Sequence, residues 1–124
     1  MGIESIKSQM KCRCCGSELL DTRMQGFLVQ LERRLGRMLT ITSGYRCPSH
    51  NATVGGAAHS FHLLGQAADI AVMDAEDAER IESLALKIGF GGIGHGKGFL
   101  HVDLGPSRCW RYGKDGKPLI KALS

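Results

Sequence analysis

Two histidines and one aspartate, His62, Asp69 and His101, place the strongest constraint on how this chain can fold. In one continuous helix, His62 and Asp69 would lie two turns apart, roughly 10 Å along the axis. A single zinc ion, whose bonds to such ligands are about 2.0–2.2 Å long, could not reach both. If they share an ion, the chain must turn between them, and Gly65 is the residue that permits the turn.

The segments that contain Asp69 and His101 are predicted to be strands. Residues 68–72 form a short apolar run, and in residues 99–104 apolar side chains alternate with His101 and Asp103. One face of the second strand can pack in the core while the other presents the imidazole to a cleft. Two imidazoles and one carboxylate, with a fourth position left to water, are the ligand count of a catalytic zinc site. By spacing alone, ordinary hydrogen-bonded polar side chains explain such residues more often than metal ligands do.

The length of the chain, 124 residues, fits one domain. We expect residues 1–124 to form a single domain, with a cysteine-containing segment at 1–20 and a tail at 105–124. No apolar run approaches the ~20 residues that span a bilayer, and the N-terminus lacks the pattern of a signal peptide. We therefore expect synthesis in the cytoplasm and no membrane insertion. We also expect a monomer.

The net charge of +4 and the pI near 8.9 favour weak attraction to polyanions, including cell-wall polymers. Only Arg33 and Arg34 are adjacent, so the positive charges form no stripe along which a nucleic acid could bind. We expect no nucleic-acid partner.

Five cysteines, an odd number, favour reduced thiols or metal ligation over a complete set of disulfides. Cys12 and Cys15 have C-x-x-C spacing, which is half of a structural zinc site. Cys47 and Cys109 could supply further ligands from a distance. A second, structural ion and plain thiols both remain open, and a disulfide to Cys47 requires that the protein work outside the cell.

The remaining pattern predicts two amphipathic helices and further short strands. A helix over residues 21–35 would begin at Asp21 and end at Gly36, with Glu32 off its apolar stripe. A second would begin at Asp74 and end at Gly89. Strands are expected at residues 38–43, 90–95 and 99–104, the last two as a hairpin, and a loop at 50–59.

Arg46 follows the first of these strands and lies beside a glycine and a proline. A guanidinium at a strand end can face a cleft and bind a carboxylate through two parallel hydrogen bonds. A solvated surface arginine is the alternative. Trp110 and Tyr112, in the tail, could line the rim of the cleft or pack in the core.

Three motifs taken together resemble the zinc D-alanyl-D-alanine carboxypeptidase family, which includes D,D-dipeptidases, phage endolysins that cut L-alanyl-D-glutamate bonds and, more distantly, the hedgehog domain. The motifs are Ser60-x-His62-x-x-Gly65-x-Ala67-x-Asp69, His101-x-Asp103 and Ser43-Gly44-Tyr45-Arg46. The resemblance covers roughly residues 12–112. It implies an α+β fold with a small antiparallel sheet of about four strands and helices packed on one side. It also implies His62, Asp69 and His101 as zinc ligands, Arg46 and Ser60 as substrate-binding residues, and peptidoglycan stem peptides as substrates.

The chain departs from this family where many members carry a general base. No carboxylate is present among residues 97–100, just before His101. The nearest titratable candidate is His95, which a hairpin could bring back toward His101 and which could act as the base. Asp103 is another candidate for the base, although we favour it as the carboxylate that orients a histidine ligand.

The sequence thus predicts a zinc metallopeptidase that hydrolyses a D-amino-acid-containing bond in peptidoglycan, as a carboxypeptidase or an endopeptidase. Arg46 and His95 are its expected catalytic residues, and release like that of a phage lysin is one route to the cell wall. The missing carboxylate motivates an alternative, a catalytically inactive zinc-binding module of the cell wall or of a virion.

Overall fold

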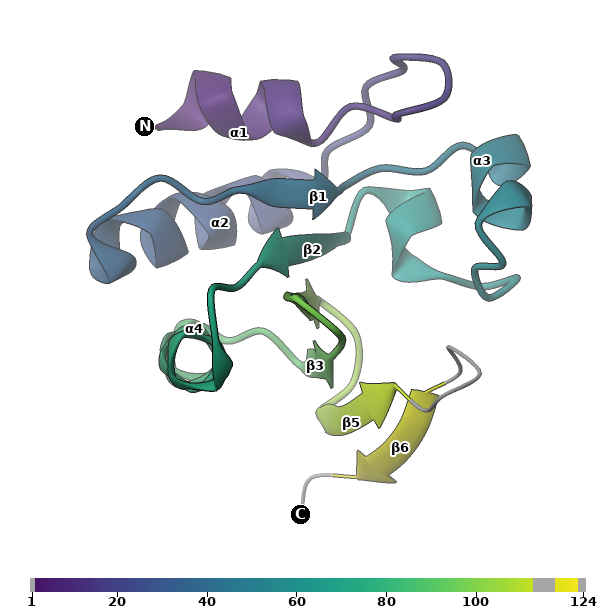
Figure 1. Cartoon of the computed structure of the whole chain (residues 1–124). Helices are drawn as coiled ribbons and strands as arrows, with labels where there is room; N and C mark the ends of the chain where they lie inside the picture. Colours follow the sequence, from purple (N-terminus) through teal and green to yellow (C-terminus); the bar gives the residue numbers. More distant parts are fainter. Residues whose placement is uncertain (1, 113–117, 123–124) are drawn as a thin grey trace.

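The computed structural model describes residues 2–112 and 118–122 and belongs to the expected α+β class (Figure 1). Four α-helices, one short 3-10 helix and six strands follow one another along this part of the chain. In order they are α1 (Ile3–Gln9), α2 (Thr22–Leu35), β1 (Ile41–Ser43), α3 (Pro48–Thr53), η1 (Phe61–Leu64), β2 (Ala67–Ala71), α4 (Ala75–Ile88), β3 (Gly92–His95), β4 (Phe99–Asp103), β5 (Arg108–Tyr112) and β6 (Pro118–Ala122).

The strands form one sheet in the order β1-β2-β4-β3-β5-β6. All neighbouring pairs are antiparallel except β3 and β5, which are parallel. The sheet is therefore larger than the four antiparallel strands we expected, because the predicted tail supplies β5 and β6. Residues 113–117 and 123–124 of that tail lie outside the described residues. The predicted β3–β4 hairpin is confirmed.

One face of the sheet packs against α2 and α4, as expected of a fold with helices on one side (Figure 1). Alternate residues of each strand point to this face, because successive side chains in a strand point to opposite sides. The core between sheet and helices includes Ile41, Ile70, Ile93, Leu100 and Val102 from the strands. The residues between them point to the other face, where η1 and α3 lie.

Helix α2 begins and ends where the sequence predicts. Its first turn is capped by Asp21, which accepts hydrogen bonds from the N–H groups of Arg23 and Met24, and Gly36 ends it with a left-handed φ of 79°. Glu32 is the exception to the predicted polar face, since only 1 % of it is exposed. Its carboxylate accepts hydrogen bonds from the N–H groups of Gly2 at 2.6 Å and Leu39 at 3.0 Å. Glu32 therefore connects α2 to the start of α1 and to the segment that precedes β1.

The loop predicted at residues 50–59 was partly wrong, because residues up to Thr53 belong to α3. Pro48 at the start of this helix needs no N–H partner and has a φ suited to the first turn. The sulfur of Cys47 accepts a hydrogen bond from the His50 N–H and so caps the helix. Among the described residues, no helix is long and apolar enough to cross a membrane.

Candidate metal centre and its cleft

The three residues singled out in the sequence, His62, Asp69 and His101, converge on the face of the sheet opposite α2 and α4. One donor atom from each lies within 4.8 Å of the other two. Asp69 Oδ1 is 2.9 Å from Nδ1 of His101 and 3.3 Å from Nε2 of His62. Because each bond from a zinc ion to such ligands is about 2 Å long, atoms at these separations can share one ion.

Two local features of the backbone produce this convergence. Asp69 on β2 pairs directly with His101 on β4, so their side chains leave the sheet on the same face. Gly65 ends η1 with a φ of 67° and lets the chain turn back from His62 into β2. A Cβ at this position would also lie 2.3 Å from the Leu19 carbonyl oxygen. The turn predicted at Gly65 is confirmed, and only glycine fits it without strain.

The second nitrogen of each histidine ring is held by an acceptor. Nδ1 of His62 donates to the Gly44 carbonyl oxygen at 2.6 Å. Nε2 of His101 lies 2.6 Å from Asp103 Oδ2, and Asp103 is in turn bound by both terminal nitrogens of Arg108. These partners leave His62 Nε2 and His101 Nδ1 facing Asp69, where each nitrogen can donate a proton to the carboxylate or, once deprotonated, offer a lone pair to an ion. Metal-binding histidines in proteins show the same arrangement.

Electrostatics keep the carboxylates of the centre ionised. Burial alone would raise the pKa of Asp69, but hydrogen bonds and charge from His101 and His62 hold that pKa well below its usual range. Burial likewise opposes ionisation of Asp103, yet His101 and Arg108 lower its pKa to about 2. An ionised, buried carboxylate between two imidazoles is a donor set suited to a zinc ion.

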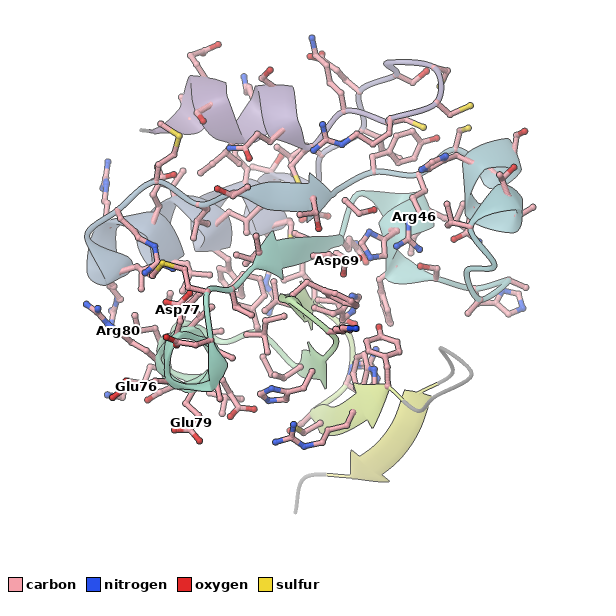
Figure 2. All side chains as sticks on the ribbon, in the orientation of Figure 1. Arg46, Asp69, Glu76, Asp77, Glu79 and Arg80 are labelled. Atoms are coloured by element: carbon pink, nitrogen blue, oxygen red, sulfur yellow. The ribbon has the colours of Figure 1, made fainter. Side chains whose placement is uncertain are left out.

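Arg46 lies beside the centre, as the sequence suggested (Figure 2). Its Nη2 is 3.2 Å from Asp69 Oδ2, its Nε donates to Ser43 Oγ at 3.0 Å, and its Nη1 donates to Asn51 Oδ1 at 3.4 Å. The guanidinium is thus fixed on three sides. With 15 % of its side chain exposed, Arg46 still reaches solvent on the side of the cleft.

The centre opens into a cleft of about 870 Å³. Ser60 lines this cleft, and its Oγ also accepts the His62 N–H at 3.2 Å, which caps η1. The cleft wall carries cationic side chains at Arg46, Lys97 and Arg108. Aromatic side chains complete the wall, namely Phe61, Phe99, Trp110 and Tyr112. A cleft with this lining suits an anionic ligand of peptide size.

His95, the expected general base, is not brought to this cleft. In the β3–β4 hairpin, Gly94 faces His101 and His95 faces Leu100, so the His95 side chain leaves the sheet on the helix-covered face. There Nε2 of His95 is 2.8 Å from Glu82 Oε2 on α4. The hairpin was predicted correctly, but its register directs His95 away from the other site residues.

Sequence reasoning missed three groups that fix the centre. Arg108 anchors Asp103, Asn51 anchors Arg46, and the Gly44 carbonyl anchors His62. Only Gly44 lies within one of the three motifs, and no periodicity marks the other two residues. Trp110 and Tyr112, left open between cleft and core, both line the cleft, although Trp110 is 6 % exposed.

The small α+β fold, with a buried His–Asp–His cluster at the base of an open cleft, defines a candidate hydrolase of the metal-dependent class. Comparison with known proteins gives the family. Residues 4–103 match the model of the Peptidase M15 family, and the chain belongs to this family of peptidases. The match confirms the resemblance inferred from the three motifs.

One curated relative is described as a probable peptidoglycan L,D-endopeptidase, MepK, from Haemophilus influenzae. It is 32 % identical to this chain over 80 residues, which cover 59 % of this chain and 42 % of the relative. The chain therefore spans less than half the length of that relative.

Proposed function

We propose that this protein is a zinc-dependent peptidase that hydrolyses a D-amino-acid-containing bond in peptidoglycan stem peptides. The observation that carries the proposal is the convergence of His62, Asp69 and His101 at the base of the cleft. Membership of the peptidase family supports hydrolysis, and the description of the Haemophilus relative supports a peptidoglycan substrate.

In this proposal His62 Nε2, an oxygen of Asp69 and His101 Nδ1 hold the ion, and the open side of the cluster faces the cleft. The residues fit zinc because imidazole nitrogens and an ionised carboxylate are donors that it prefers. When bound, zinc supplies Lewis acidity that polarises a peptide carbonyl and lowers the pKa of water. Hydrolysis adds one water across the C–N bond and releases a carboxylate and an amine.

Arg46 is the residue we assign to the anionic part of the substrate. Its planar guanidinium can bind a terminal carboxylate, or the oxyanion that develops on the scissile carbonyl, through paired N–H donors. Ser43 and Asn51 hold it in place before substrate arrives, so little conformational entropy is lost on binding. Ser60 is a second substrate contact at the cleft wall.

Tyr112 is a further hydrogen-bond donor for the oxyanion in this proposal. It lines the cleft on β5 and its ring contacts those of Phe99 and Trp110, with centroids 5.5 Å and 6.1 Å away. Burial raises the pKa of its phenol above the ordinary value, and so does the negative charge of Asp69. The phenol therefore keeps its proton at neutral pH and can donate it in a hydrogen bond.

The test is digestion of purified peptidoglycan by the zinc-loaded protein, with the released muropeptides identified by mass spectrometry. New termini at one defined bond, absent with His62→Ala, would support the proposal and identify that bond. His95→Ala is the matched control, since the His95 side chain is hydrogen-bonded to Glu82 on the face of the sheet opposite the cleft. Loss of activity in His95→Ala with unchanged zinc content would contradict this placement and support His95 as the general base.

A second candidate function, a zinc-binding module without hydrolytic activity, is favoured by one observation. The only carboxylates among the described residues that line the cleft are Asp69 and Asp103, and both are engaged by histidine and arginine partners. No carboxylate in this lining is left to act as a general base. Saturable binding to peptidoglycan, dependent on His62 and without release of new termini, would support this function instead.

A further inference from the structure

A second cluster of potential metal ligands lies away from the cleft, among the cysteines. Sγ atoms of Cys12, Cys15 and Cys47 all lie within 4.8 Å of one another. Cys12 is buried, Cys47 is half-buried and Cys15 is exposed. In a tetrahedral zinc site with Zn–S bonds of about 2.3 Å, the sulfur atoms are spaced just under 4 Å apart. Small side-chain movements would bring these three thiols to that spacing.

The backbone around the first two cysteines forms a tight turn. The Gly16 N–H donates to the Cys12 carbonyl at 2.8 Å, and the Cys12 N–H donates to the Ser17 carbonyl at 2.9 Å. Gly16 has a φ of 72°, which permits the chain to reverse directly after Cys15. This turn directs the sulfurs of a C-x-x-C pair to one side, as structural metal sites require.

Backbone N–H groups point at the sulfurs. The Cys47 N–H donates to Cys12 Sγ at 3.4 Å, and the His50 N–H donates to Cys47 Sγ at 3.4 Å. An N–H group that donates to a cysteine sulfur stabilises the thiolate over the thiol. The thiolate, which is the form that binds metals, is thereby favoured.

We propose that Cys12, Cys15 and Cys47 bind a second zinc ion with a structural role, separate from the His–Asp–His centre. Three thiolates are soft ligands that select zinc over magnesium or calcium. The exposed side of Cys15 leaves the fourth position to solvent. This proposal does not depend on the hydrolysis proposed above, because its ligands do not line the cleft.

The ion would tie the N-terminal segment to the loop that builds the catalytic centre. That loop, residues 43–48, carries the carbonyl of Gly44, which holds His62, and the side chain of Arg46. The two segments are already joined by a hydrogen bond from the Tyr45 N–H to the Met10 carbonyl at 2.8 Å. A metal ion bound by Cys12, Cys15 and Cys47 would join the same two segments by metal–sulfur bonds in addition to this hydrogen bond.

Cobalt substitution tests this proposal on the full chain, because only thiolate ligands give cobalt an intense near-ultraviolet charge-transfer band. The His–Asp–His centre has no sulfur ligand, so its occupation leaves this band absent. We expect the reduced, metal-free protein to develop the band on addition of cobalt and to lose it when zinc displaces the cobalt. Zinc analysis of His101→Ala, in which the first centre is impaired, should still give about one equivalent.

Cys12→Ser and Cys47→Ser are expected to abolish the band and to remove the equivalent of zinc that His101→Ala retains. Cys14→Ser is the matched control within the same turn, and Cys109→Ser controls for the other sulfur-containing cluster, Glu82–His95–Cys109. Both controls should keep the band.

Three outcomes would overturn the proposal. The first is absence of the band in the unaltered reduced protein, a result that does not depend on any variant folding. The second is loss of the band in Cys14→Ser or Cys109→Ser. The third is an intact mass two hydrogens lower, with a Cys12–Cys47 or Cys15–Cys47 disulfide, in protein isolated without oxidant.

Discussion

Asp69 and His101 lie directly opposite each other on β2 and β4, with Asp69 Oδ1 2.9 Å from His101 Nδ1. The other nitrogen of the same ring is 2.6 Å from Asp103. The imidazole is therefore held between two carboxylates, one of which is a candidate ligand and the other an anchor. Its orientation is set by the sheet register before any ion binds, which limits the reorganisation that metal binding requires.

Replacing Arg108 should weaken metal binding without removing a ligand. Arg108 holds both oxygens of Asp103 and so orients the carboxylate that orients His101. We expect Arg108→Ala to lower zinc affinity about 10- to 100-fold, measured by competition with a chromophoric chelator. Arg111→Ala, which alters an exposed residue of the same strand, should leave the affinity unchanged. Equal affinities in the two variants would show that Asp103 needs no anchor.

Removing the Tyr112 hydroxyl should slow catalysis more than it weakens substrate binding. A donor that acts on the oxyanion contributes mainly in the transition state, so Tyr112→Phe is expected to lower kcat by about 10²- to 10³-fold with little change in KM. Zinc content measured on the same sample should stay constant. Tyr45→Phe, which alters a tyrosine that does not line the cleft, provides the comparison. A kcat equal to that of the unaltered protein would remove Tyr112 from the mechanism.

A side chain at Gly65 should disturb both folding and the metal centre. The left-handed φ of 67° and the nearby Leu19 carbonyl both oppose a Cβ there. We expect Gly65→Ala to lower the free energy of unfolding by more than about 1 kcal/mol in urea titrations. Gly26→Ala is the control: Gly26 lies within α2, and beyond the backbone of that helix no atom lies within 4 Å of where a Cβ would be. This change should raise the stability by about 0.5–1 kcal/mol. Two variants of equal stability would contradict the assignment of strain at Gly65.

Acid should destabilise the fold in part through Asp77, on α4 (Figure 2). Burial alone would raise the pKa of Asp77, but hydrogen bonds from the Met73 N–H and Arg37, together with the charge of Arg80, hold it below the ordinary value. The ionised carboxylate therefore stabilises the fold above the unfolded carboxyl pKa of about 3.9, and this stabilisation is lost as pH falls through the lower, folded pKa.

Asp77→Asn tests this pH dependence. Relative to the unaltered protein, it should lose roughly 1–2 kcal/mol of unfolding free energy near neutral pH and less near pH 3, because below about pH 3.9 the carboxyl of the unfolded chain takes up a proton and the stabilisation by the folded carboxylate shrinks. Urea denaturation at both pH values measures the difference. Glu79→Gln changes an exposed carboxylate on the same helix that projects into solvent (Figure 2) and should show no such dependence. A destabilisation by Asp77→Asn that is the same at both pH values would contradict the role of its charge.

Much of the centre could be predicted from local sequence because the constraints on it are local. The ligand spacing required a turn, Gly65 supplied it, and alternation in the strands placed His101 opposite the core. Helices α2 and α4 followed from apolar periodicity and from their capping residues Asp21 and Asp74.

What could not be predicted depends on pairings between distant segments. The side of the sheet that His95 occupies is set by the hairpin register, which shifts every side chain to the other face when it changes by one residue. The parallel pairing of β5 with β3 joins segments that are not consecutive strands, and so Arg108 and Tyr112 reach the cleft without any local signal. The carboxylate of Glu32 is buried and accepts hydrogen bonds from N–H groups of two other segments. The position of Glu32 on its helix gives no sign of these partners.

The two histidines of the centre differ in how mutation can release them. His101 is held by a side chain, so a single substitution at Asp103 or Arg108 can free its ring. His62 is held by a main-chain oxygen that every amino acid possesses, and substitution at position 44 is opposed by Met10, whose Cα would lie 2.5 Å from a new Cβ. Single substitutions can therefore change the ring orientation of His101, whereas that of His62 changes only if the backbone of the loop at residues 43–48 moves.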